Sequence, residues 1–344
     1  MLTLSAKTLT TAASAIFEAA GTPSDIAGFV ADSLVGSNLA GHDSHGVIQI
    51  PAYVDQIRDG ILAPAARPEV AREGSAVIQV DGAWGFGQYA ASTCMDLAIE
   101  KARRNQMAMV TITRVNHVGR LGQWAEQAAS AGVVGMLGVS WGAGPYAATP
   151  FGGAGRVLST NPIAFGIPLA DGKRFVLDFA TTAVAEGKLR VARAKGSPVP
   201  DGWIVDAAGR PTNDVEAFYT GGGMLQTFGG HKGFALSMAI ELLSIALTAA
   251  DAAPDDRQRK NGGFFLAIDP TAIRSLDAFT AEAAELCSRV TGVPAAPGFD
   301  GVLLPGEPEE RTRQQRLANG IELAESTWEA IQDTARTVGA AIPT

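Results

Sequence analysis

Residues 75–113, SAVIQVDGAWGFGQYAASTCMDLAIEKARRNQMAMVTIT, decide the class of the fold. The two ends of this stretch, AVIQVDG (76–82) and MAMVTIT (107–113), are short apolar runs rich in β-branched residues, which is typical of strands. Between them, residues 90–104 carry apolar side chains at helical spacing. A strand, a helix and a second strand in this order predict an α/β domain.

The same alternation continues along the chain. VVGMLGVS (133–140) and RFVLDFA (174–180) are predicted strands, and Leu121–Ala131 is a predicted helix. Towards the C-terminus, Gly233–Ala250 predicts a buried helix that is apolar except for one polar seam, made of Ser237, Glu241, Ser244 and Thr248. DAAPDDRQRKNGG (251–263) predicts an exposed loop, and residues 314–338 predict a final amphipathic helix.

The first sixty residues are predicted to be helical. Ser24 is a suitable N-cap for a helix that Gly41 would end. A second helix is expected through Tyr53, with Pro51 in its first turn and Gly60 at its end. We therefore expect a helical region before the α/β domain.

Composition excludes several classes of protein. The 344 residues are 47% hydrophobic with a net charge of −8, so we expect a large core and neither a nucleic-acid nor an anionic membrane partner. No signal peptide is recognised, and the apolar run 235–250 is too short to span a membrane. Cys94 and Cys287 are predicted to be reduced thiols, which favours a cytoplasmic location.

Two glycine patterns resemble the dinucleotide fingerprint of Rossmann folds, but their contexts argue against it. GFGQYA (85–90) follows a predicted strand and opens a predicted helix, yet the next strand ends in Arg114 rather than in an acid for the ribose. GAGPYA (142–147) places Pro145 in the loop and leads into a segment that cannot be a helix. Neither pattern therefore predicts a Rossmann cofactor site.

The run GHDSHG (41–46) holds two of the four histidines in the chain and is compatible with three kinds of chemistry. His42 and His45 could bind a metal, but zinc would need further ligands. Ser44 could be a nucleophile, but the spacing is not GxSxG. His45 could be an acid/base, and His117 and His231 also lie near glycines at loop-to-helix junctions, as in a ligand cleft.

GHDSHG, followed by PAYVDQIRDG (51–60), resembles the malate/L-lactate dehydrogenase superfamily that is unrelated to the Rossmann lactate dehydrogenases, and is most similar to its hydroxycarboxylate dehydrogenase branch. Further matching stretches follow in family order up to about Ile321: NHVGRLGQWAEQAA (116–129), PFGG (150–153), RVLSTNPIAFGIP (156–168), LDFATTAVAEGKLRVARAKGSPVPDGW (177–203), GRPTND (209–214), FGGHKGFALSMAIELL (228–243) and PGE (305–307).

The resemblance implies an α/β fold with a non-Rossmann cofactor domain on a mostly antiparallel β-sheet. It also implies that the helical N-terminal region, 1–74, packs with the C-terminal helix, 305–344. The cofactor domain would be 75–230, with a helix and a smaller subdomain in 231–304 completing the cleft. The implied protein is a homodimeric oxidoreductase that uses NAD or NADP and acts on a small 2-hydroxy acid or 2-oxoacid.

The resemblance also assigns roles to single residues. His45 matches the proton donor/acceptor of the family, Ser44 the residue that orients it, and Lys188 is a further catalytic candidate. The implied substrate-binding residues are Gln49, Tyr53 and Thr160. The implied cofactor contacts are His117, Val118, Gly119, Arg120, Leu121, Asp178, Phe179, Ala180, His231, Lys232, Glu307 and Arg311. A histidine suits this chemistry, because its ordinary pKa of about 6.5 lets it accept and return the hydroxyl proton.

Two departures from the family pattern bear on the substrate. Many members have an arginine for the substrate carboxylate where this chain has Gln49. Either another cation, for which Lys188 and Arg120 are the candidates, binds the carboxylate instead, or the carboxylate is held more weakly. This change favours a larger or aromatic substrate side chain over a small dicarboxylate. The imine-reducing branch has an acid at the position of Lys188, so hydroxy-acid oxidation is favoured over cyclic ketimine reduction.

Two functions of a different class are compatible with the same residues. One is that of a metal-dependent hydrolase in which His42 and His45 bind the metal. The second is that of a binding protein that takes up the cofactor but performs no catalysis. Both are less favoured than the dehydrogenase that the resemblance implies.

Overall fold

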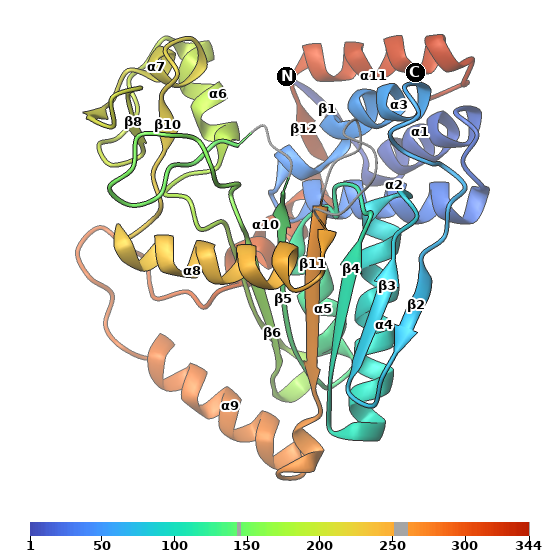
Figure 1. Cartoon of the computed structure of the whole chain (residues 1–344), viewed down its shortest axis with the longest axis vertical. Coiled ribbons are helices and arrows are strands. Elements are labelled where there is room, and N and C mark those ends of the chain that lie inside the picture. Colours follow the sequence, from blue (N-terminus) through green and yellow to red (C-terminus); the bar gives the residue numbers. More distant parts are fainter. Residues whose placement is uncertain (143–145, 251–260, 344) are drawn as a thin grey trace.

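A seven-stranded sheet forms the centre of the molecule (Figure 1). The computed structural model describes residues 1–142, 146–250 and 261–343. The strand order is β2 (Glu69–Glu73), β3 (Val77–Asp81), β4 (Met107–Thr113), β11 (Asn261–Ile268), β5 (Val134–Trp141), β6 (Ile163–Pro168) and β7 (Arg174–Phe179). Within this sheet only β3 and β4 pair in parallel, so the expected mostly antiparallel sheet is confirmed.

Helices cover both faces of this sheet. α4 (Gly87–Asn105) and α5 (Leu121–Ser130) pack on one face, and α8 (His231–Glu241), continued by a π-helical turn at Leu242–Ala246, packs on the other (Figure 1). β5 shows why such close packing is possible. A side chain at Gly135 would collide with Ala128 of α5, whereas one at Gly138 would collide with the ring of Phe264 on the α8 side.

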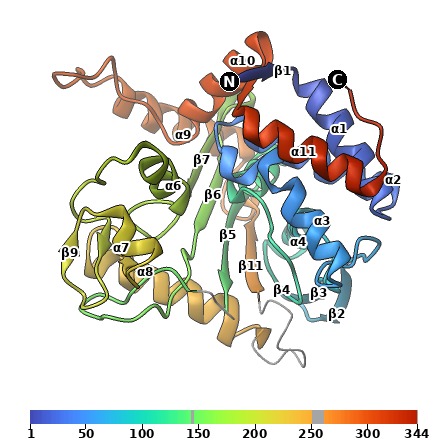
Figure 2. The same ribbon diagram turned by 90° about the horizontal axis from the view of Figure 1, so that it is seen from above.

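The N-terminal helices and the C-terminal helix share a second core, as expected. α1 (Ala6–Ala19), α2 (Ser24–Leu39) and α3 (Ile50–Arg58) pack with α11 (Glu325–Val338), and β1 (Leu2–Leu4) pairs with β12 (Ile321–Leu323) (Figure 2). Their buried side chains include Phe17, Leu34, Tyr53, Trp328 and Ile331.

The prediction of a single helix over residues 314–338 is wrong. Gly320, at φ +89°, ends α10 (Glu307–Asn319), and the chain forms β12 before it begins α11. A positive φ is easy for glycine because it has no Cβ. Other boundaries were close: β4 has the predicted bounds, Pro51 lies in the first turn of α3, and Gly41, at φ +83°, follows the end of α2. Ser24 begins α2 but does not cap it, because Pro23 holds the N-cap position.

A smaller unit with its own core stands beside the sheet. It contains α6 (Glu186–Lys195), β8 (Ile204–Val205), β9 (Pro211–Thr212), α7 (Val215–Tyr219) and β10 (Met224–Leu225). β11 lies at the centre of the large sheet, so the expected boundary at 231 separates this strand from the sheet to which it belongs.

The polar seam predicted for the helix over Gly233–Ala250 is present, since Ser237, Ser244 and Thr248 are almost fully buried.

α9 (Leu276–Thr291) extends away from the rest of the chain (Figures 1 and 2). None of its residues is buried. The predicted loop over 251–263 and the glycine pattern GAGPYA fall largely on residues 251–260 and 143–145, which lie outside the described residues. No described helix has both the length and the hydropathy of a membrane span.

Candidate active site

The GHDSHG run forms a tight connection between α2 and α3, and Asn38 of α2 holds it in place. A short 3₁₀ turn covers Asp43–His45, and a second covers Val47–Gln49. The side-chain oxygen of Asn38 accepts the backbone N–H of Val47 at 2.9 Å. A Cβ on Gly46 would lie 2.2 Å from that same oxygen, so the position requires glycine.

Asp43 and His42 both contact side chains of α10, which gives them a structural role. The carboxylate of Asp43 accepts two hydrogen bonds from Arg316, at 2.6 and 3.0 Å, and a third from the amide of Asn38 at 2.7 Å. The Nε2 atom of His42 lies 3.5 Å from Glu309. These contacts attach the histidine run to the C-terminal part of the chain. In the described part of the chain, no three His, Cys, Asp or Glu residues form a group that could hold a metal ion.

His45 stacks on His117. The two ring centroids are 5.2 Å apart and the planes differ by 25°. Ser44 Oγ lies 3.0 Å from His45 Nδ1. The structure therefore brings together two histidines that are far apart in the sequence.

Tyr53 lies behind His117 rather than among the residues that line the cleft. Its side chain is 2% exposed, and its hydroxyl lies 2.6 Å from His117 Nδ1. The amide of Gln88, which is fully buried, donates to the same hydroxyl at 2.7 Å. The Tyr53 hydroxyl therefore lies between the Gln88 amide and the His117 ring.

The surroundings of His45 disfavour its charged form. Desolvation is the largest cause, and repulsion that a protonated His45 would meet from His117, His42 and Arg120 adds to it; together they lower the pKa of His45 from 6.5 to about 3. A histidine with this pKa is neutral at physiological pH.

A cavity of about 120 Å³ opens beside His45, and we call it the His45 cleft. Predicted site residues that line it are His45, His117, Val118, Gly119, Leu121 and Thr160. The remaining lining residues are Val115, Asn116, Val139, Ser140, Trp141, Ser159, Pro162, Asn261 and Gly262. The loop before α5, the TNP segment and the end of β5 thus converge on one site.

Asp178 occupies one of the backbone N–H groups at the amino end of α5. Its Oδ2 accepts the N–H of Gly122 at 2.7 Å. Burial nevertheless raises the pKa of Asp178 above its ordinary value. Arg120, which is 3% exposed, forms an ion pair with Glu126 at 2.7 Å. Neither side chain lines the His45 cleft.

Gln49 and Lys188 lie near the GHDSHG loop, which carries Ser44 and His45. Gln49 donates its amide to the backbone oxygen of Ser44 at 2.6 Å, so it stabilises the loop. Lys188 is exposed in the first turn of α6, next to Gly187. A methyl group at Gly187 would come within 3.6 Å of Ser44 Cβ, which places the start of α6 against the histidine run.

The remaining predicted cofactor residues do not line the His45 cleft. His231 and Lys232 are exposed at the start of α8, where the ring of His231 lies 5.9 Å from that of Phe151. Ala180 follows β7, and Phe179 packs edge-on against Phe228 at 5.4 Å.

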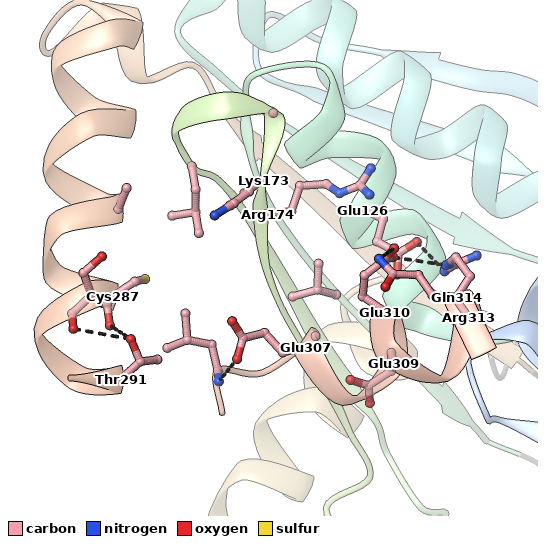
Figure 3. A pocket seen from close by; sticks show the side chains of 17 residues that line it. Glu126, Lys173, Arg174, Cys287, Thr291, Glu307, Glu309, Glu310, Arg313 and Gln314 are labelled. Atoms are coloured by element: carbon pink, nitrogen blue, oxygen red, sulfur yellow. Dashed lines mark hydrogen bonds and ion pairs between the residues drawn. The ribbon is translucent and has the colours of Figure 1, made fainter. Parts of the chain in front are cut away.

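Glu307 lines a second cavity, of about 510 Å³, between α9 and α10 (Figure 3). Its carboxylate accepts the backbone N–H of Leu304 at 2.9 Å. Arg311 is exposed and does not line this cavity, whereas Arg313 does and pairs with Glu126 at 3.4 Å (Figure 3). Lys173 and Arg174 also border it.

Two amides of the site were not predicted from the sequence. Asn116 lines the His45 cleft and Gln88 supports Tyr53. Asn116 directly precedes His117 in the quoted NHVG segment, which is the only local signal for it. Gln88 lies inside one of the rejected glycine patterns, and only the tertiary fold reveals its contact with Tyr53.

Comparison with known proteins gives a consistent result. A family model described as malate/L-lactate dehydrogenase matches residues 4–332. Hydroxycarboxylate dehydrogenase B of Escherichia coli strain K12 is 38% identical over 339 residues, which are 97% of this chain and 94% of that protein. Delta(1)-pyrroline-2-carboxylate/Delta(1)-piperideine-2-carboxylate reductase of Pseudomonas syringae pv. tomato is 33% identical over 93% of this chain and 92% of its own length. The structure of sulfolactate dehydrogenase from Methanocaldococcus jannaschii superposes with a TM-score of 0.90 at 30% identity, covering 98% of each chain.

Proposed function

Because the chain belongs to the malate/L-lactate dehydrogenase family, we propose that it oxidises a 2-hydroxy acid with NAD or NADP and reduces the corresponding 2-oxoacid in reverse. The observation that carries this proposal is the stacked pair of His45 and His117 at the cleft. A bound nicotinamide would supply the hydride acceptor in one direction and the donor in the other. The buried oxygen of Asn116, which has no partner in the described structure, supports a ligand with N–H groups in this cleft.

In this proposal His45 manages the proton. Removing a hydride from a 2-hydroxy acid leaves the hydroxyl proton to be accepted, and a neutral imidazole can accept it. The low pKa of His45 keeps the ring neutral before the substrate binds. An anionic substrate adds a negative charge near the ring, so the pKa rises in the complex and the proton can be held.

We propose a supporting role for His117. In this role the Tyr53 hydroxyl, 2.6 Å from Nδ1, would donate to that atom, and a neutral His117 would carry its hydrogen on Nε2. Such an N–H can donate to the substrate oxygen while His45 takes the proton. Stacked rings 5.2 Å apart disfavour two positive charges at once, so the pair would carry one added proton.

Lys188 is the cation that we propose for the substrate carboxylate. Of the two candidates, Arg120 is buried and paired with Glu126, whereas Lys188 is exposed beside the Ser44 loop. No lysine or arginine of the described chain lines the His45 cleft itself. The carboxylate would therefore be held beside the cleft, where the start of α6 lies against the Ser44 loop.

An absorbance assay at the nicotinamide band tests this function. NADH and NADPH are each offered with pyruvate, oxaloacetate, 2-oxoglutarate, phenylpyruvate and a cyclic ketimine. We expect turnover with at least one open-chain 2-oxoacid, the larger ones being favoured by Gln49. Turnover with the ketimine alone would assign the reductase activity that the Pseudomonas syringae relative is named for. Absence of turnover with every substrate would contradict the proposal.

Replacing Lys188 by Met tests the carboxylate contact in the same assay. We expect KM for the preferred oxoacid to rise at least about tenfold, because a charge-assisted hydrogen bond is lost. The affinity for the cofactor should stay within about twofold, and Lys188→Arg should recover part of the lost affinity for the oxoacid. An unchanged KM would show that another group binds the carboxylate.

A further inference from the structure

Asn116 lines the His45 cleft, and its side chain carries a buried hydrogen-bond acceptor without a partner in the described structure. The residue is 2% exposed. Its Nδ2 donates to the backbone oxygens of Trp84 and Gly85, at 2.7 and 3.1 Å. Carbonyl oxygens only accept, so this amide cannot be turned around, and Oδ1 is fixed on the other side. That oxygen is buried and has no hydrogen-bond partner in the described structure.

A second side-chain amide lines the same cleft. Asn261, the first residue of β11, lies opposite Trp141 of β5 in the sheet register. Its Oδ1 is also buried without a hydrogen-bond partner among the described residues. The two residues that carry these unpaired oxygens therefore line one small cavity.

Buried acceptors of this kind indicate a ligand that brings hydrogen-bond donors, because native proteins seldom leave such atoms unpaired. A substrate carboxylate has no hydrogen to donate and would be repelled by these oxygens. A 2-hydroxy acid has one hydroxyl hydrogen, and the proposed reaction directs it to His45. A primary carboxamide has two N–H donors on one nitrogen, which matches the demand.

We infer that Asn116 accepts a hydrogen bond from the carboxamide of the nicotinamide ring, and that Asn261 accepts the second N–H. This inference rests on the proposed function. Trp84 and Gly85 fix the amide of Asn116. Its hydrogen bond to the carboxamide would therefore set how the nicotinamide ring is rotated about the bond to the ribose. The reactive carbon is then held in one orientation relative to His45.

Cofactor analogues test the inference without changing the protein. Calorimetry measures the Kd values of NAD, of 3-acetylpyridine adenine dinucleotide and of ADP-ribose, or of the 2′-phosphorylated set if NADP is preferred. The acetyl group replaces the NH₂ of the carboxamide by a methyl group and so lacks both donors. We expect the acetylpyridine analogue to bind at least about tenfold more weakly than NAD, because a buried acceptor is left unpaired.

Variants localise the effect. In Asn116→Leu, the preference for NAD over the acetylpyridine analogue should fall to about one, while ADP-ribose should bind as it does to the wild type. Asn105→Leu is the matched control, because Asn105 also donates its amide to a backbone carbonyl but lies exposed at the opposite end of β4. It should keep the full preference. If Asn116→Leu does not fold, Asn261→Leu, measured in the same way, should lower the preference.

The outcomes separate the inference from the proposed function. Equal affinities of the wild type for NAD and the acetylpyridine analogue would overturn the inference and leave the dehydrogenase proposal standing. A retained preference in a folded Asn116→Leu would also overturn it. Failure of the wild type to bind any nicotinamide dinucleotide would overturn the proposed function itself.

Discussion

At the scale of the residue, the environment of His45 sets its protonation. Desolvation is the largest cause of its low pKa, and the nearby charge of His117 adds to it. The neutral ring is the form that the proposed reaction requires, since it can accept a proton from a hydroxyl group. Burial of a neutral histidine also lowers the stability of the fold in acid.

The pH dependence of stability follows from this low pKa. In the unfolded chain His45 has its ordinary pKa of 6.5, whereas in the folded chain the pKa is about 3. The unfolded state therefore binds more protons between these values, and stability is lost as the pH falls from 6.5 towards 3. Between pH 7.5 and 5 the loss due to His45 should be about 2 kcal/mol.

Urea unfolding of His45→Asn at both pH values checks this. The variant should lose about 2 kcal/mol less than the wild type on acidification, because its side chain does not titrate. His231→Asn, which replaces an exposed histidine, should follow the wild type. Equal losses in His45→Asn and the wild type would show that the ring is not held neutral.

At the scale of the element, α2 shapes the loop that carries His45. Asn38, near the end of this helix, binds both Val47 N–H and Asp43. Gly46 lies so close to Asn38 that a methyl group cannot be added without displacing the amide. Helix and loop therefore form one rigid unit.

Gly46→Ala should destabilise the protein by about 1–3 kcal/mol, the usual cost of overpacking. Activity should fall as well, because the loop that positions His45 must move. Gly28→Ala is the matched control within α2, where an added methyl group meets no atom within 4 Å. It should stabilise the fold by about 0.5–1 kcal/mol, because alanine favours helix. Thermal unfolding distinguishes the two, and an unaffected Gly46→Ala would contradict the packing described.

Local sequence predicted some elements and not others. β4 and α5 were predicted almost to the residue, because their apolar patterns are strong and turn residues bound them. β2 was missed because all five of its residues are exposed, so it has no alternating pattern. β11 was missed because NGGFFLAI follows a polar run and its glycines are weak strand formers. Its place between β4 and β5 is a tertiary fact that no local pattern contains.

At the scale of the whole molecule, the site depends on both ends of the chain. His42 and Asp43 contact Glu309 and Arg316, residues that lie more than 250 positions away in the sequence. No local sequence pattern could have predicted these contacts. The resemblance did predict that the N-terminal region packs with the C-terminal helix. The homodimer and the cytoplasmic location stay predictions.

Turnover and cofactor affinity of His45→Asn, measured at pH 7.5, test the central claim most directly. Above pH 6.5 His45 is neutral in both the folded and the unfolded chain, so the change does not alter stability through charge. The account predicts a loss of kcat of about 10²–10⁴-fold, the usual contribution of an acid/base, with the Kd for the cofactor within about twofold of the wild type. A kcat within about tenfold of the wild type would contradict the role of His45 and direct attention to His117.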